Sequence, residues 1–273
     1  MSSSAILRLQ FWGVRGSCPT PGPSTAEVGG NTSCVQLSAG DEHLILDGGT
    51  GLRALGNALL EEGPVRASIL FSHVHWDHIQ GVPFFAPIFR ADTELDLYGA
   101  PEEGSLVSVL ESQMTRPTFP VDLAAVPATL RFHDLTPGAT FRVGSYRVRS
   151  APLNHPNGVL AFRIEVGGRA IVYATDTEHY EGGRIDETLV ELARGADILI
   201  YDAQYTEDEY SDADGRGRRG WGHSTWNEGV RVGRAAGVHQ LILFHHDPSR
   251  DDAGVAELEG LAASVLPGTV AAR

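Results

Sequence analysis

Short apolar runs recur along the chain, and each ends in a polar side chain. Runs of this length, rich in Val, Ile and Leu and bounded by Gly, Pro or Asp, are typical of buried strands. The runs lie in EHLILDGG, ASILFSHVH, SYRVRSAPLNHP, RAIVYATDT, ADILIYDAQ and HQLILFHHD, and they lead to Asp47, His73 and His75, His155, Asp176, Asp202, and His245 and His246. Because strand ends hold side chains rigidly at one edge of a sheet, we expect these polar groups to converge.

Helical patterns separate several of the predicted strands. They cover residues 50–62, 104–115, 185–195, 225–236 and 253–264. Strands mixed with helices predict a layered α/β fold. The sequence shows no linker, low-complexity tract or strong repeat, so we predict a single domain over residues 1–273.

The composition narrows the classes of function. Apolar residues make up 42% and charged residues 21%, as in ordinary globular proteins. The net charge of −14 argues against a protein that reads a nucleic-acid backbone and favours a small substrate. No signal peptide or membrane-spanning run is visible, so a cytoplasmic protein without a membrane partner is expected. Cys18 and Cys34 are predicted to be thiols, with a Cys18–Cys34 bridge as the alternative.

The stretch SHVHWDH concentrates metal-binding side chains. It holds His73, His75, Asp77 and His78. If the strand continues through it, His73 and His75 share a face and can bind one ion, while Asp77 and His78 enter a loop and can reach a second. A polar loop or a helix cap would explain one such histidine, but not four at this spacing.

The same stretch resembles the signature of the metallo-β-lactamase superfamily. The resemblance implies an αββα sandwich with a two-metal site at one edge, and an enzyme that is a metal-dependent hydrolase. It extends to Asp47 in LILDGGTG, which matches an acidic residue that supports the site from behind. It implies two divalent ions, with zinc expected and Mn²⁺ or Fe²⁺ as alternatives.

The resemblance also assigns metal ligands residue by residue. The first ion would be held by His73, His75 and His155. Asp77 and His78 would hold the second, and Asp176 would bridge both. The implied ligands are His73, His75, Asp77, His78, His155, Asp176 and His245. In LILFHHD, His246 is the alternative to His245.

Two further motifs resemble the branch of ribonuclease Z and its phosphodiesterase relatives. WGHSTWNEG contains His223, and LIYDAQYTEDEY contains Asp202. A carboxylate fixes the tautomer of its histidine partner, so the pair can protonate a leaving alkoxide. The alternative is that His223 only precedes a helix capped by Ser224 or Thr225.

The chain departs from ribonuclease Z in one respect. That enzyme carries a long basic arm for tRNA between its third histidine and its bridging aspartate. Between His155 and Asp176 this chain has only a predicted β-hairpin, turning at Gly167–Gly168. A small phosphodiester, such as a cyclic nucleotide, is therefore the expected substrate. A homodimer is left open.

Other residues are candidates for substrate binding. Arg15 and Asn31, in a Gly/Pro-rich loop, would meet a phosphate or support the metal loops, or would only hydrogen-bond backbone. A charged segment over residues 205–223 contributes arginines, and aromatic residues offer a wall for a base. These are Arg216, Arg218 and Arg219, and Trp76, Phe84, Phe85, Phe119 and Trp221, with Trp76 or Phe119 preferred.

The implied reaction is attack on phosphorus by hydroxide formed at the two ions, oriented by Asp77, with His223 as proton donor. Three alternative functions stay open. The first is a hydrolase of a lactone, thioester or β-lactam, the second is a non-catalytic metal-binding sensory domain, and the third is a di-iron redox protein. The histidines at positions 75 and 78 disfavour the last, because redox members usually have a carboxylate in this cluster.

Overall fold

The computed structural model describes residues 7–211 and 217–273. The chain forms two compact units. Unit 1 comprises the chain up to Gly13 together with Asn31–Thr136, and unit 2 comprises Val14–Gly30 together with Pro137–Arg273. Each unit has its own sheet and its own helices, and the single-domain organisation stays a prediction.

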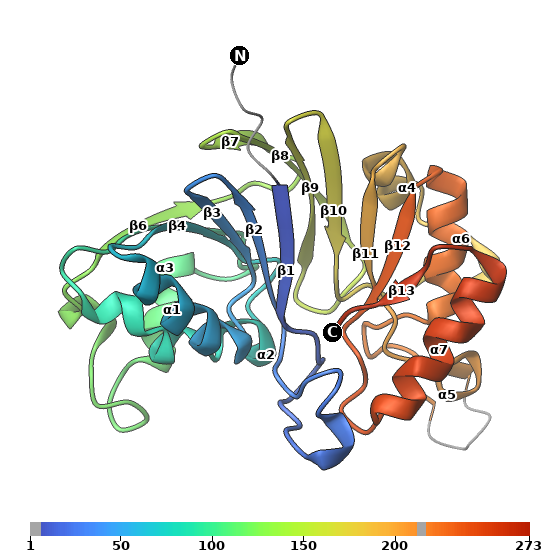
Figure 1. The fold of residues 1–273 in the computed structure, drawn as a ribbon, viewed down its shortest axis with the longest axis horizontal. Coiled ribbons are helices and arrows are strands. Elements are labelled where there is room, and N and C mark those ends of the chain that lie inside the picture. Colours follow the sequence, from blue (N-terminus) through green and yellow to red (C-terminus); the bar gives the residue numbers. More distant parts are fainter. Residues whose placement is uncertain (1–6, 212–216) are drawn as a thin grey trace. The chain divides into compact units, whose positions relative to one another are not determined.

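Unit 1 is built on a sheet whose strands follow one another in chain order (Figure 1). Its first three strands are antiparallel and the remaining pairs are parallel. The strands are β1 (Leu7–Gly13), β2 (Cys34–Ala39), β3 (Glu42–Leu46), β4 (Arg66–Leu70), β5 (Glu94–Gly99) and β6 (Thr129–Asp134). The helices are α1 (Gly51–Glu62), α2 (Trp76–Ile79) and α3 (Leu106–Gln113), with 3₁₀ turns η2 (Val82–Phe84), η3 (Ala86–Phe89) and η4 (Leu123–Ala125). Leu52, Leu55 and Leu59 of α1 are buried in the core of this unit.

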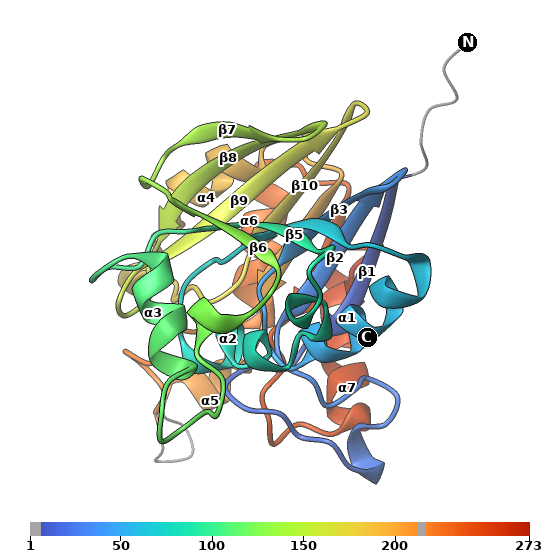
Figure 2. The same cartoon turned by 90° about the vertical axis from the view of Figure 1, so that its left-hand side faces the viewer.

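Unit 2 has a second mixed sheet, in the order β13-β12-β11-β10-β9-β8-β7. Figure 2 shows β7 to β10 side by side, and these pairs are antiparallel, whereas β10 to β13 run parallel. The strands are β7 (Thr140–Val143), β8 (Tyr146–Leu153), β9 (Val159–Val166), β10 (Arg169–Ala174), β11 (Ile198–Asp202), β12 (Gln240–Phe244) and β13 (Val270–Ala271). The helices are α4 (Glu187–Ala193), α5 (Glu207–Ser211), α6 (Trp226–Ala236) and α7 (Asp252–Val265), with 3₁₀ turns η1 (Pro23–Thr25) and η5 (Glu181–Gly183).

The predicted α/β fold class is confirmed, and so are the individual elements. Every apolar run singled out in the sequence forms a strand, and every predicted helical segment contains a helix. The hairpin between β9 and β10 turns at Gly167 and Gly168, whose φ angles of 57° and 78° are those of a two-residue turn with two left-handed positions. Within the described residues, no helix is both long and apolar enough to cross a membrane.

The SHVHWDH segment differs from its prediction. The strand β4 ends at Leu70, so His73 and His75 do not share a strand face. Asp77 and His78 lie in the short helix α2 rather than in a loop. His75 has extended backbone angles and forms the N-cap of α2, and Asp77 lies in the first turn, where a carboxylate is favoured by the helix dipole.

Candidate metal centre

In unit 1, one buried carboxylate orients two of the predicted ligands. Asp47 follows β3 and accepts hydrogen bonds from the Ser72 amide at 2.7 Å, from the Ser72 hydroxyl at 2.8 Å, and from His78 Nδ1 at 2.8 Å. The Ser72 hydroxyl in turn lies 3.1 Å from His73 Nδ1. Because that hydroxyl donates to Asp47, it accepts from His73. Asp47 therefore holds His78 directly and His73 through Ser72.

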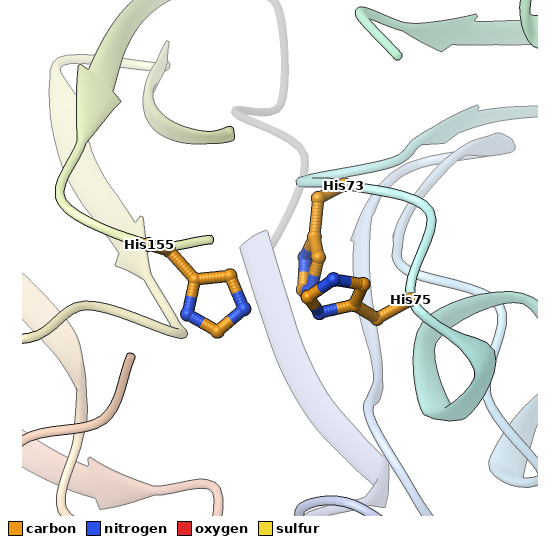
Figure 3. A group of neighbouring side chains, drawn as sticks. All are labelled: His73, His75 and His155. Carbon is orange, nitrogen blue, oxygen red and sulfur yellow. The ribbon is translucent and has the colours of Figure 1, made fainter. Parts of the chain in front are cut away.

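The histidine rings of the SHVHWDH segment gather around His73. Its ring centroid lies 4.5 Å from that of His75 and 4.2 Å from that of His78. Figure 3 shows the His73 and His75 rings edge to face after β4. Asp77 Oδ2 lies 3.3 Å from His78 Nε2, and both side chains are buried. The four metal-binding groups of SHVHWDH thus form one cluster within their own unit.

In unit 2, three strand exits bring a carboxylate between two imidazoles. His155 follows β8 and is also labelled in Figure 3, Asp176 follows β10, and His245 follows β12. Asp176 Oδ1 lies 3.3 Å from His245 Nε2, and Asp176 Oδ2 lies 3.8 Å from His155 Nε2. Each oxygen of this buried carboxylate therefore faces a different histidine, as a bridging ligand would.

His223 stands beside this group and is held by its own carboxylate. Its Nδ1 lies 2.9 Å from Asp202 Oδ2, at the end of β11. Its ring stacks on that of His245 at a centroid distance of 4.8 Å. Asp202 also accepts the amide hydrogens of Thr177 and Gln204, so its own position is fixed. The following helix α6 is capped by Thr225, which accepts from the Glu228 amide, so the cap that the alternative expected is present; His223 has its separate hydrogen bond to Asp202.

Hydrogen bonds at Nδ1 define which ring nitrogen is basic. The Nδ1 atoms of His155 and His245 meet the carbonyl oxygen of Gly222 at 2.7 Å and the Gln204 side-chain oxygen at 2.9 Å. Both partners are acceptors, so Nδ1 carries the proton and Nε2 carries the lone pair. The same reasoning applies to His73, His78 and His223. Histidines oriented in this way are characteristic of metal sites.

The backbone is strained at the same strand exits. Asp47, Asp176 and His245 have φ angles of 60°, 53° and 58°, in the left-handed region that residues other than glycine rarely adopt. Such conformations persist where the surroundings impose them, and they cluster at functional sites. Imidazole and carboxylate groups are the ligands that zinc and similar divalent ions prefer. The residues of both units therefore fit metal binding.

The structure separates the two candidate histidines of LILFHHD. His245 Nε2 faces Asp176, whereas His246 Nε2 lies 3.1 Å from the carbonyl oxygen of Ala272. Burial lowers the pKa of His246 to about 3, so this ring is neutral at physiological pH. Its partner is the residue that follows β13, and His245 is the one that lies with the other candidate ligands of unit 2.

Arg15 and Asn31 hydrogen-bond backbone, as one of the roles predicted for them requires. The buried Arg15 guanidinium donates to the carbonyl oxygens of Gly29 at 2.8 Å and Arg250 at 2.6 Å. The Asn31 amide donates to the Trp12 carbonyl and accepts from Thr50. Both therefore stabilise loops. Cys18 is exposed and Cys34 is buried, and both are free thiols, so the alternative of a bridge does not hold.

The candidate substrate-binding residues fall into different environments. Phe85 is buried in the core of unit 1, whereas Trp76 and Phe84 are 61% and 58% exposed. The ring of Phe119 packs edge to face on that of Phe84, with a centroid distance of 5.7 Å. In unit 2, Trp221 is 62% exposed. The arginines at 218 and 219 lie over the rings of Tyr205 and Tyr210, and Arg216 lies outside the described residues.

Two supporting residues of unit 2 were missed in the sequence. Gln204 fixes His245, and its own amide nitrogen donates to the Tyr205 hydroxyl at 3.1 Å. Its position two residues after Asp202 on an extended segment was the available signal, because alternate residues share a face. Glu178 accepts from the Tyr210 hydroxyl and from the amides of Gly220 and Gly222, and so it holds the loop that precedes His223. No local pattern marks that role.

Replacing Gly222 by alanine is expected to displace His155. A Cβ atom at Gly222 would lie 2.2 Å from His155 Nδ1, whereas one at Gly220 would have no neighbour within 4 Å. Both glycines have left-handed φ angles, 85° and 81°, so Gly220→Ala carries the same backbone strain and is the matched control. We expect Gly222→Ala to lower metal affinity by about 10–100-fold, as changes to groups that orient metal ligands do. Metal titration of both variants checks this, and equal affinities would contradict it.

The chain belongs to the β-lactamase superfamily, because the family model described as the beta-lactamase superfamily domain matches residues 43–246. It is a metal-binding hydrolase with the metallo-β-lactamase fold. Ribonuclease Z of Methanothermobacter thermautotrophicus is 27% identical over 88% of this chain and 86% of that protein. The metallo-beta-lactamase fold protein YhfI from Bacillus subtilis is similar in structure, with a TM-score of 0.73 at 20% identity over 99% of this chain and 97% of that one. A diphosphatase from the PhnP family gives a TM-score of 0.72 at 19% identity, over 98% and 95% of the two chains.

Proposed function

We propose that the protein is a phosphodiesterase that holds two divalent ions, zinc by preference, and acts on a small phosphodiester such as a cyclic nucleotide. The ligands we propose are His73, His75, Asp77, His78, His155, Asp176 and His245. When bound, such ions supply the Lewis acidity that activates a water and neutralises charge on phosphoryl oxygens.

The observation that carries the proposal is the Asp202–His223 pair. His223 is held through Nδ1, so its Nε2 can be protonated and present a proton to a leaving oxygen. A proton donor is needed for a poor leaving group such as the alkoxide of a sugar. The thiolate released from a thioester leaves without a proton, so the pair favours a phosphodiester over a thioester.

The remaining residues have roles that follow from their places. Asp77 is the only carboxylate among the unit 1 ligands that we propose, and it would accept a proton of the attacking water and orient it. Asp202 would stabilise the protonated imidazole of His223. Asp47 and Gln204 would keep the His78 and His245 rings in their binding orientation.

The size of the substrate is inferred from the segment between His155 and Asp176. Most of the segment is taken up by β9, β10 and their tight turn, over residues 159–174, so this part of the chain has no arm that would grip a folded RNA. The net charge of −14 adds a general repulsion of long polyanions. The ribonuclease Z relative supports hydrolysis of a phosphodiester. The short hairpin and the negative net charge favour a substrate smaller than a folded RNA.

A substrate panel tests the proposal. The purified protein, with its metal content measured, is offered adenosine 3′,5′-cyclic monophosphate, bis-p-nitrophenyl phosphate, a short RNA, a lactone and nitrocefin. We expect turnover of the two small phosphodiesters and little of the others. Faster cleavage of the lactone or nitrocefin would contradict the proposed phosphodiester bond. Preferential cleavage of RNA would contradict the proposed small substrate. Tightly bound ions without turnover of any compound would favour a sensory domain.

A further inference from the structure

A cavity in unit 2 opens directly onto His223. Its volume is 770 Å³, within the range of pockets that hold small ligands. Trp221, Tyr205 and Arg218 line it together with His223, and Ser17 and Asp247 contribute polar groups. All of these residues belong to unit 2, so the cavity is formed within one compact unit.

The walls of this cavity combine an aromatic surface with polar groups. Trp221 is 62% exposed, although tryptophan is usually among the more buried side chains. Tyr205 forms a buried wall, with its ring 6.0 Å from that of His223 and 5.4 Å from the Arg218 guanidinium. Burial raises the pKa of Tyr205, so its hydroxyl stays neutral, and the oxygen accepts a hydrogen bond from the Gln204 amide. Ser17 has a left-handed φ of 62°, a strained conformation at the cavity wall.

We propose that this cavity binds the nucleoside that carries the leaving oxygen, with its base stacked on Trp221. The inference rests on the proposed function, because the group protonated by His223 must lie beside the His223 ring. A base provides the flat surface that an exposed indole would cover. Its edges and the sugar hydroxyls provide partners for the polar lining. A purely apolar leaving group would leave those polar groups desolvated and unpaired, at a cost in affinity.

The kinetic test compares two substrates that differ only in the base. They are adenosine 3′,5′-cyclic monophosphate and the corresponding sugar cyclic phosphate without adenine. Stacking of a base on an aromatic side chain is worth about 1–3 kcal/mol, so Trp221→Ala should raise KM for the nucleotide about tenfold or more, with kcat little changed. KM for the base-free diester should stay the same, and Trp221→Phe should restore most of the affinity. Leu261→Ala, which removes an exposed apolar side chain from α7, is the matched control.

A binding measurement separates this inference from the proposed function. Calorimetry with adenosine 5′-monophosphate should show an affinity about tenfold weaker for Trp221→Ala than for the unaltered protein. If the protein hydrolyses no phosphodiester but still binds this nucleotide through Trp221, the proposed function fails and the nucleoside cavity stands. If diesters are hydrolysed and Trp221→Ala changes neither KM nor the affinity, the nucleoside assignment is overturned. It is also overturned if both substrates are weakened equally, because Trp221 would then act only on the fold of its loop.

Discussion

Replacing His223 by alanine is expected to slow hydrolysis of adenosine 3′,5′-cyclic monophosphate by about 10²–10⁴-fold, the usual contribution of a positioned proton donor. The leaving oxygen of this substrate is an alkoxide, which leaves slowly unless it is protonated. Bis-p-nitrophenyl phosphate releases a stable phenolate that needs no proton, so its hydrolysis should change much less. The ratio of the two rates is therefore the sharpest measurement of the role of His223.

Metal content is the necessary companion measurement. His223 contacts Asp202 through Nδ1 and is not among the ligands we propose, so the His223→Ala protein should keep its ions. His239→Ala is a suitable control, because it removes an exposed imidazole of unit 2 from the segment before β12. Loss of metal from His223→Ala, or equal slowing of both substrates, would assign His223 to metal binding instead of proton transfer.

Replacing Asp176 by asparagine is expected to remove metal from the protein and abolish hydrolysis of every substrate. The change eliminates a buried negative charge that faces His245 through one oxygen and His155 through the other. The loss of affinity should exceed the about 10–100-fold effect of altering a supporting residue, because a ligand itself is lost. Asparagine tolerates the left-handed backbone at this position, so the variant tests charge rather than strain.

The control for this change is Asp186→Asn. Asp186 is another buried carboxylate of unit 2, and it caps α4 by accepting from the Leu189 amide at 3.0 Å. Asparagine caps helices about as well as aspartate, so this variant should keep its fold, its metal and its activity. Metal analysis by mass spectrometry and a thermal melt of both variants measure the difference. An Asp176→Asn protein with a full complement of ions would contradict the bridging role we propose.

The sequence predicted the elements of the fold well, because their signals are local. In HQLILFHHD the continuous apolar run and its polar exit are enough to define a buried strand and a functional loop. The helix α6 (Trp226–Ala236) is similarly marked by Thr225 before it and Gly237 after it, which cap its two ends in the structure. Signals of this kind depend on neighbouring residues alone, so one sequence suffices to read them.

The features of the fold and of the site that the sequence did not predict depend on contacts between residues far apart in the chain. The short helix α2 was missed because one helical turn leaves no periodic pattern, and its N-cap, His75, is not a residue type that marks a helix start. Glu178 was missed because its partners lie more than thirty residues away, at Tyr210 and Gly222. The role of Arg15 cannot be read from the sequence for the same reason, since the carbonyl of Arg250 becomes its partner only after folding.

The double role of Asp47 limits how the metal preference of this protein can be altered. Its carboxylate sets the orientation of His73 through Ser72 and that of His78 directly. By the resemblance, these two imidazoles serve different ions. Redesign of one coordination sphere at Asp47 or Ser72 would therefore disturb the other, and the effects of such changes would not add. An engineer who wishes to exchange a single ion should begin instead with the residues of unit 2, where Gly222 and Gln204 each support one histidine.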